Sequence, residues 1–409
     1  MRFNVMAFVV CSLTSFTLTK QDYWLTIFVH GSVGLRPSLA VNTLMHLITD
    51  QIEESPYRKT VEAIRADHFF YKNQAIQQIG LLPIHTLNGN YENSAAQLFA
   101  DLYNYVQQEV NPEQTNIYYT YGWSGLISHK ARYKDARIFY EKLREELNEL
   151  KKRHITPKIR IVAYSHGGNI GLLLGRIREE LYPNDTFEIN ELVLIGTPIQ
   201  SQTDFLVCNP IFIKVYNIYS RGDCIQPLDC FSPYRFFSRR RFKSCGRYNV
   251  PRKVIQIEIK IKAPGNKPAN LRKWHDRSPG HLELWTFGWP IDTHSFYRTY
   301  FPLTPLPTGI FAPLFTDIAD DCDDLGSQIV LEWYPAIGKM EVRARRSYKR
   351  YCIDFLDAEQ LATMKHYAYE HQPPSYTHVV AECRTCEVVR QANDRKIIRK
   401  KRTSPCFQA

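Results

Sequence analysis

One serine stands where a buried strand turns directly into a helix, and that setting suits a nucleophile. The segment KIRIVAYS (158–165) holds the apolar, β-branched residues Ile159, Ile161 and Val162, as strands do, and GNIGLLLGRIREEL (168–181) has the pattern of a helix. A tight turn between the two holds its serine in a strained conformation and directs the hydroxyl out of the sheet. The pattern therefore predicts Ser165 as a catalytic nucleophile.

The neighbours of Ser165 have the sizes and backbone groups that such a turn needs. Ala163 and Gly167 are small, and strand and helix nearly touch at these two positions. The first turn of a helix directs its unbonded N–H groups toward negative charge. We therefore expect the N–H of His166 to be one donor of an oxyanion hole, and its side chain to line the pocket.

Strands and helices alternate over most of the chain. Continuous apolar strands in such an order predict an α/β fold with a mostly parallel sheet covered by helices on both faces. Ligands bind beyond the carboxyl ends of the strands in such sheets, where Ser165 stands. The expected strands end near residues 30, 122, 164, 195, 220 and 261, and the expected helices cover most of 38–80, 93–108, 134–153 and 168–181.

The turn resembles the nucleophile elbow of α/β-hydrolases, commonly G-x-S-x-G and here AYSHG (163–167). Three further segments agree in the same order along the chain: HG (30–31), LVLIGTP (192–198) and YNIYSRGDCIQP (216–227). Together they are similar to lipases and esterases over residues 23–298. The resemblance implies an α/β-hydrolase fold and a Ser-His-Asp triad.

The resemblance also implies roles for individual residues. Asp223 stands where lipases carry the triad acid, with Asp229 and Asp204 as the alternatives. The N–H of Ser32, which follows the His-Gly pair, would be the second oxyanion donor. His30 would brace that loop and take no chemical step.

The triad histidine should follow the last strand, because the order in these enzymes is serine, acid, histidine. His275, His281 and His294 are the candidates. We favour His281, since the preceding Pro-Gly puts it in a loop at the start of an apolar helix. His294 is the alternative triad histidine.

These residues would make the chain a serine hydrolase that cleaves a carboxylic ester, including a lipid ester, through an acyl-enzyme. No metal or organic cofactor is expected. The alternative is a hydrolase-fold binding protein that has lost catalysis and engages an anionic membrane or another partner. The sequence does not favour nucleic acid as a partner, and it leaves the oligomeric state open.

Basic residues give the chain a net charge of +11, and they are clustered. RFFSRRRFK (235–243) lies within a basic, aromatic segment at 228–249, and RKIIRKKR (395–402) lies near the end. The 228–249 segment could be a lid over an acyl site, dock on an anionic surface, or be a solvated insertion.

The expected domains are a hydrolase domain at 21–305, a small α+β or β-rich C-terminal module at 306–389, and a basic disordered tail at 390–409. The module should hold strands at 327–335 and 339–355 and a helix capped by Asp357. Residues 1–20 resemble a secretory signal but also suit an ordinary first element. The protein would be secreted or periplasmic in the first case and cytoplasmic in the second.

Ten cysteines leave the compartment open, because disulfides or buried thiols would both fit. Four of them are close in sequence: Cys208, Cys224, Cys230 and Cys245. CRTC (383–386) has the spacing of metal ligands but no second pair nearby, so a zinc site is the less favoured interpretation. Its further ligands would come from Cys352, Cys406, His366, His371 and His378.

Overall fold

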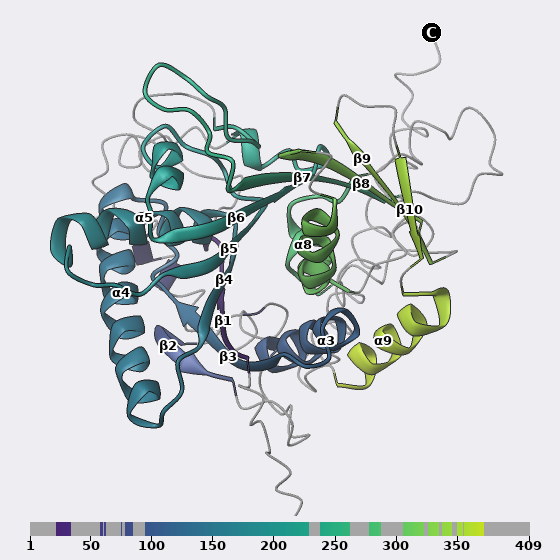
Figure 1. Cartoon of the computed structure of the whole chain (residues 1–409), viewed down its shortest axis with the longest axis horizontal. Coiled ribbons are helices and arrows are strands. Elements are labelled where there is room, and N and C mark those ends of the chain that lie inside the picture. The colour runs from purple at the N-terminus through teal and green to yellow at the C-terminus, as the bar shows by residue number, and fades with distance from the viewer. Residues whose placement is uncertain are drawn as a thin grey trace, which may run out of the picture.

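The described part of the chain forms one ten-stranded sheet with helices on both faces (Figure 1). The strand order is β10-β9-β8-β7-β6-β5-β4-β1-β3-β2. The computed structural model describes residues 22–33, 58–59, 61–62, 75, 78–84, 95–228, 238–261, 278–287, 306–322, 326–334, 338–345, 350–354 and 356–371.

The centre of the sheet is parallel, from β3 through β1, β4, β5, β6 and β7 to β8. Antiparallel strands close both edges, β2 on one side and the β9-β10 pair on the other. The strands are β1 (Tyr23–Val29), β2 (Gly80–Pro83), β3 (Thr115–Gly122), β4 (Lys158–Tyr164), β5 (Ile189–Ile195), β6 (Phe212–Tyr219), β7 (Val254–Ile261), β8 (Gln328–Tyr334), β9 (Lys339–Ala344) and β10 (Arg350–Asp354).

The central strands β1, β4 and β5 are largely buried on both faces, and they are rich in apolar residues. Successive side chains point to opposite faces, so Phe28 joins one core while Ile27 and Val29 join the other. α4 (His129–Lys152) and α5 (His166–Leu181) cover one face. The other face packs against α3 (Ala95–Val110), α8 (Ala312–Asp321) and α9 (Ala358–Glu370).

The edges of the sheet differ from the sequence-based expectation. β2 ends the region that we expected to be mostly helical, and Pro83 is tolerated because β2 is an edge strand. The single strand expected at 339–355 is instead two, β9 and β10, which pair antiparallel. One strand of that length would extend far beyond its neighbour β8 and leave its backbone groups without partners.

The strands expected in a C-terminal module belong to the main sheet. β8 pairs in parallel with β7, and β9 continues the sheet from β8. The core on this face is shared by residues of β7, β8 and α8. In the described residues, 328–354 therefore extend the main sheet and form no sheet of their own. The expected cap of α9 is confirmed, since the Asp357 side chain accepts the N–H groups of Glu359 and Gln360.

The described half of the expected lid, 238–249, is fixed to the body of the protein. The side chain of Phe242 is buried in the core beneath α5. The backbone of Arg239 forms a bridge with Ile199, and Asn217 and Gln256 donate to the backbone of this segment. These residues are part of the packed structure, and a lid role for the whole segment 228–249 stays a prediction. Residues 229–237 lie outside the described residues.

Several other predictions also lie outside the described residues: the segment 1–20, the tail 390–409, and the Cys383–Cys386 pair. No helix among the residues that the structure describes is long and apolar enough to cross a membrane.

Candidate active site

Ser165 occupies a strained turn between β4 and α5, as the sequence predicts. Its φ of 51° and ψ of −130° are rarely adopted by residues other than glycine, and such a conformation costs about 1–3 kcal/mol. The surrounding structure holds it there, because the Ser165 N–H donates to the carbonyl of Ile195 at the end of β5, 2.9 Å away. The turn is therefore held in place by the neighbouring strand.

The start of α5 touches the loops beside it so closely that only small residues fit. A Cβ on Gly167 would lie 2.3 Å from the carbonyl oxygen of His30. A Cβ on Gly168 would lie 2.0 Å from the Thr197 hydroxyl. The sequence predicted the need for a small residue at Gly167, and the same need at Gly168 becomes visible only in the structure.

Gly167→Ala is therefore expected to lower the free energy of unfolding by about 1–3 kcal/mol, the usual cost of overpacking. The added methyl would meet a backbone carbonyl, which cannot rotate away. Urea unfolding measures the change. Gly246→Ala is the matched control, because nothing lies within 4 Å of a Cβ at that exposed position. Equal stability of the two variants would contradict the close packing.

The structure brings His281 to Ser165. Its Nε2 lies 3.0 Å from the Ser165 hydroxyl oxygen, and its Nδ1 lies 2.6 Å from Oδ2 of Asp223. With the proton on Nδ1, the ring donates to the carboxylate and accepts the serine proton on Nε2. These three residues form one continuous hydrogen-bonded chain beyond the carboxyl ends of β4 and β6.

The loop that carries His281 is fixed by contacts with residues that are distant in sequence. The Ser220 hydroxyl donates to the carbonyl of Pro279 at 2.6 Å, and the Tyr164 hydroxyl donates to the carbonyl of His281 at 2.9 Å. Burial, and the nearby charge of Asp223, raise the pKa of Tyr164 well above its ordinary value, so the phenol keeps the proton that it donates. Both contacts position the backbone next to the imidazole.

Asp223 is fully buried, and each of its two oxygens has a defined partner. Oδ1 accepts the N–H groups of Ile225 and Gln226 at 3.0 and 2.9 Å, while Oδ2 faces His281. Hydrogen bonds from backbone N–H groups favour the charged form of a carboxylate. The arrangement therefore fixes the carboxylate at the far end of the imidazole.

The alternative candidates lie elsewhere. Asp204 forms an ion pair with Arg247 at 3.1 Å, whereas Asp223 is the carboxylate that meets His281. Asp229, His275 and His294 lie outside the described residues.

Gly196 is a residue of the site whose role the sequence did not reveal. It has a φ of +59°, which favours glycine. A Cβ there would lie 3.2 Å from Oδ2 of Asp223 and 3.5 Å from Nδ1 of His281. A larger residue would push into the hydrogen bond between the two. The motif LVLIGTP was the available signal, but it does not show what the glycine faces.

The loop after β1 lies directly against the serine. A Cβ on Gly31 would lie 2.8 Å from the Ser165 Cβ, so the backbone that carries the Ser32 N–H is next to the nucleophile. His30 fixes this loop: its Nδ1–H donates to the Gly31 carbonyl at 2.6 Å, and its Nε2 accepts the Trp123 N–H at 3.1 Å. The bracing role expected of His30 agrees with these contacts.

The side chain of His166 is buried. Its Nδ1 accepts from the guanidinium of Arg132, itself 2% exposed, at 2.5 Å. The expectation that this side chain lines the pocket stays a prediction. Its backbone N–H begins α5, where the helix supplies no partner, so the expected oxyanion donor stays a prediction.

No metal site is found among the described residues, where no cluster of three His, Cys, Asp or Glu side chains could hold an ion. Cys208, Cys224 and Cys245 are thiols and form no disulfide in the structure. Cys230 lies outside the described residues.

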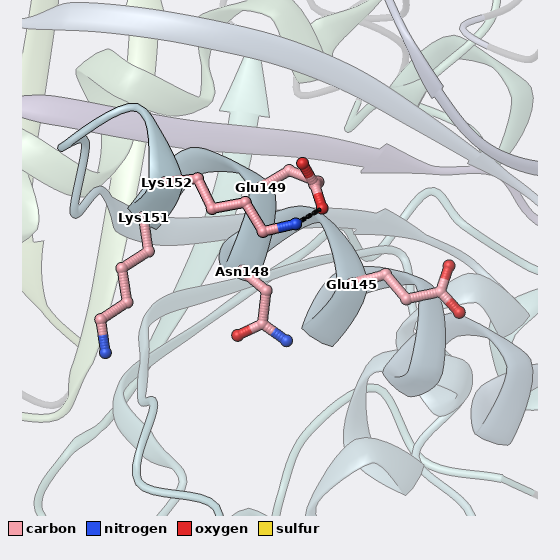
Figure 2. A pocket seen from close by; sticks show the side chains of 5 residues that line it. All are labelled: Glu145, Asn148, Glu149, Lys151 and Lys152. Carbon is pink, nitrogen blue, oxygen red and sulfur yellow. Dashed lines mark hydrogen bonds and ion pairs between the residues drawn. The ribbon is translucent and has the colours of Figure 1, made fainter.

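A separate hollow at the end of α4 has neither a serine nor a histidine among the side chains that line it. Figure 2 shows the side chains that line it: Glu145, Asn148, Glu149, Lys151 and Lys152. α4 leads into β4 and therefore ends at the edge where the parallel strands begin, opposite the edge that carries Ser165. Its charges are mixed, and Lys152 pairs with Glu149 at 2.6 Å. We do not regard it as the active site.

Comparison with known proteins adds little to this geometry. No family model and no curated protein matches the sequence. A solved structure of a presumed cell surface hydrolase from Lactobacillus plantarum WCFS1 is 15% identical with a TM-score of 0.22, covering 50% of this chain and 70% of its own. The lin2722 gene product of Listeria innocua is 16% identical with a TM-score of 0.22, covering 50% of this chain and 73% of its own. Likenesses this weak assign no function, so the functional conclusion depends on the geometry of the site.

Proposed function

We propose that the protein is a serine hydrolase in which Ser165 is the nucleophile, His281 the general base and Asp223 the acid of a triad. One observation carries the proposal: the unbroken hydrogen-bonded chain from the serine hydroxyl through the imidazole to the buried carboxylate, with distances of 3.0 and 2.6 Å. Three such groups at the carboxyl edge of a parallel sheet are the constellation that acyl transfer requires.

The reaction would begin with attack of the Ser165 oxygen on the substrate carbonyl carbon while the hydroxyl proton passes to Nε2 of His281. Asp223 keeps the other ring proton on Nδ1 and stabilises the imidazolium that forms. The imidazolium then protonates the leaving alcohol as the carbon–oxygen bond of the ester breaks. An acyl group remains on Ser165, and the imidazole is neutral again.

Water completes the cycle by the same route. His281 removes a proton from the attacking water, the acyl–serine bond breaks, and the proton returns to the Ser165 oxygen. The negative oxygen in both tetrahedral intermediates would be held by the N–H groups of Ser32 and His166. A single donor of this kind contributes about 3 kcal/mol of barrier lowering. The packing of Gly31 against Ser165 and the position of His166 at the start of α5 support this assignment.

A carboxylic ester is the substrate class that we propose, with a lipid ester as the finer possibility. The triad chemistry suits an ester, whereas the acyl-chain length and the head group of the preferred substrate depend on the surface above Ser165. Esters of nitrophenol with acyl chains of increasing length would separate a lipase-like from a short-chain preference.

A fluorophosphonate probe is expected to label the protein, and mass spectrometry of the digested protein should find the adduct on Ser165. The reason is that the probe reacts with a serine activated by its base and held next to an oxyanion hole. The Ser165→Ala variant should not be labelled. A folded wild-type protein that stays unlabelled would contradict the proposed function.

A further inference from the structure

A second hollow is lined in part by Arg221 and Pro227, which flank Asp223 in sequence, and basic side chains dominate its walls. They come from three parts of the chain: the end of β6, the segment 238–249 and the end of β9. The six cations are Arg221, Arg239, Arg240, Arg241, Lys243 and Arg345.

The positive charge in this hollow is poorly balanced. Among the described residues, Glu258 is the carboxylate that pairs with these cations, contacting Arg221 at 2.7 Å and Arg345 at 3.4 Å. Its side chain is 1% exposed, so it lies beneath the hollow rather than in it. No carboxylate of the described residues forms an ion pair with Arg239 or Lys243. Like charges held this close repel one another unless an anion joins them.

Two guanidinium groups of the hollow, those of Arg240 and Arg241, are held in position by contacts with the surrounding protein. Arg240 donates to the carbonyl of Asp223 at 3.1 and 2.7 Å through its Nε and Nη2. Arg241 donates to the Gln328 side chain at 3.0 Å and lies over the Tyr219 ring. Burial lowers the pKa of Arg241, and the neighbouring charge of Arg345 lowers it further. Arg240 and Arg241 are thus held in place next to other cations, and an anion would reduce the repulsion among them.

We propose that this hollow binds an anion with clustered phosphate groups. Arginine presents a planar fork of donors that matches phosphate oxygens, and charge-assisted bonds of this kind are strong. Several arginines around one small hollow match several phosphates on one ligand better than they match a single carboxylate. The ligand is either a soluble polyphosphorylated molecule or the head group of a phosphorylated lipid, since both present the same chemistry.

The test uses the full chain and the double variant Arg239→Glu/Lys243→Glu. These side chains have no ion-pair partner among the described residues, so the fold should tolerate the change. Lys134→Glu/Lys151→Glu is the control, because it alters net charge equally at exposed positions on α4.

Binding of inorganic tripolyphosphate is measured by titration calorimetry at low salt. Sedimentation with phosphatidylcholine vesicles, with and without a phosphatidylinositol bisphosphate, tests the lipid source. Circular dichroism checks that each variant is folded.

We expect the wild type to bind, and the Arg239→Glu/Lys243→Glu variant to bind at least about tenfold more weakly, whereas the control binds like the wild type. Loss of tripolyphosphate binding supports a soluble ligand. Loss confined to the phosphoinositide vesicles supports a lipid head group. No binding of either probe by the wild type, or equal weakening in both variants, would overturn the proposal. Neither measurement depends on hydrolase activity, so the result is separate from that of the proposed function.

Discussion

Ser165→Ala is expected to lower kcat for an activated ester by about a millionfold, the loss seen when a triad serine is removed. The hydroxyl is the atom that the imidazole of His281 faces at 3.0 Å, and no other nucleophile replaces it in the proposed reaction. The fold should survive, because alanine removes only the hydroxyl and keeps the backbone bond to Ile195. Hydrolysis of nitrophenyl butyrate under saturating conditions measures the effect.

The control for this variant is Ser327→Ala, which removes an exposed hydroxyl at the start of β8. Its activity should equal that of the wild type. If Ser165→Ala kept most of the activity, the hydrolysis would have another source and the proposed nucleophile would be wrong.

The centre of the fold could be predicted from sequence because its signals are local. Every residue of β4 after Lys158 is buried, and residues 161–164 are apolar without the alternation of a half-exposed strand. The turn at Ser165 is visible in the same way, since the small residue at Gly167 follows from the contact between strand and helix. A pattern within ten residues of the serine was therefore sufficient to indicate the elbow.

The edges could not be predicted, because strand pairing depends on partners far away in sequence. Nothing in residues 327–335 shows that β8 lies in parallel beside β7, which is more than sixty residues earlier. The packing of the segment 238–249 could not be predicted for a related reason. Its many arginines left a lid, a docking segment or a solvated insertion open, but the side chains of Phe242 and Tyr248 pack against the core.

The contacts that position the imidazole are equally hidden from sequence. Pro279 and Gly280 marked a loop, and that was the reason to favour His281. The bonds that hold the loop come from Ser220 and Tyr164, at the ends of two other strands. Gly196 belongs to the motif LVLIGTP, yet only the structure shows that it lies against Asp223 and His281.

His281→Ala is expected to lower kcat by about as much as the loss of the serine, because the members of a triad act as one unit. The imidazole is the group that can take the Ser165 proton, and its second nitrogen is held by Asp223 at 2.6 Å. For the same reason, the double variant Ser165→Ala/His281→Ala should be about as slow as either single variant. If the two residues contributed independently, the fold-losses in kcat of the two single variants would multiply in the double variant. The same ester assay, run on all three variants, distinguishes the two outcomes.

His294→Ala discriminates between the two candidate histidines, and it should leave kcat within a few-fold of the wild type if His281 is the base. His366→Ala serves as a neutral comparison, because that side chain is 73% exposed and pairs with Glu370 on α9. A large loss in His294→Ala together with a small one in His281→Ala would assign the base to the other histidine. The contacts favour His281, because a base must lie within hydrogen-bond reach of the proton that it removes, and the imidazole of His281 does.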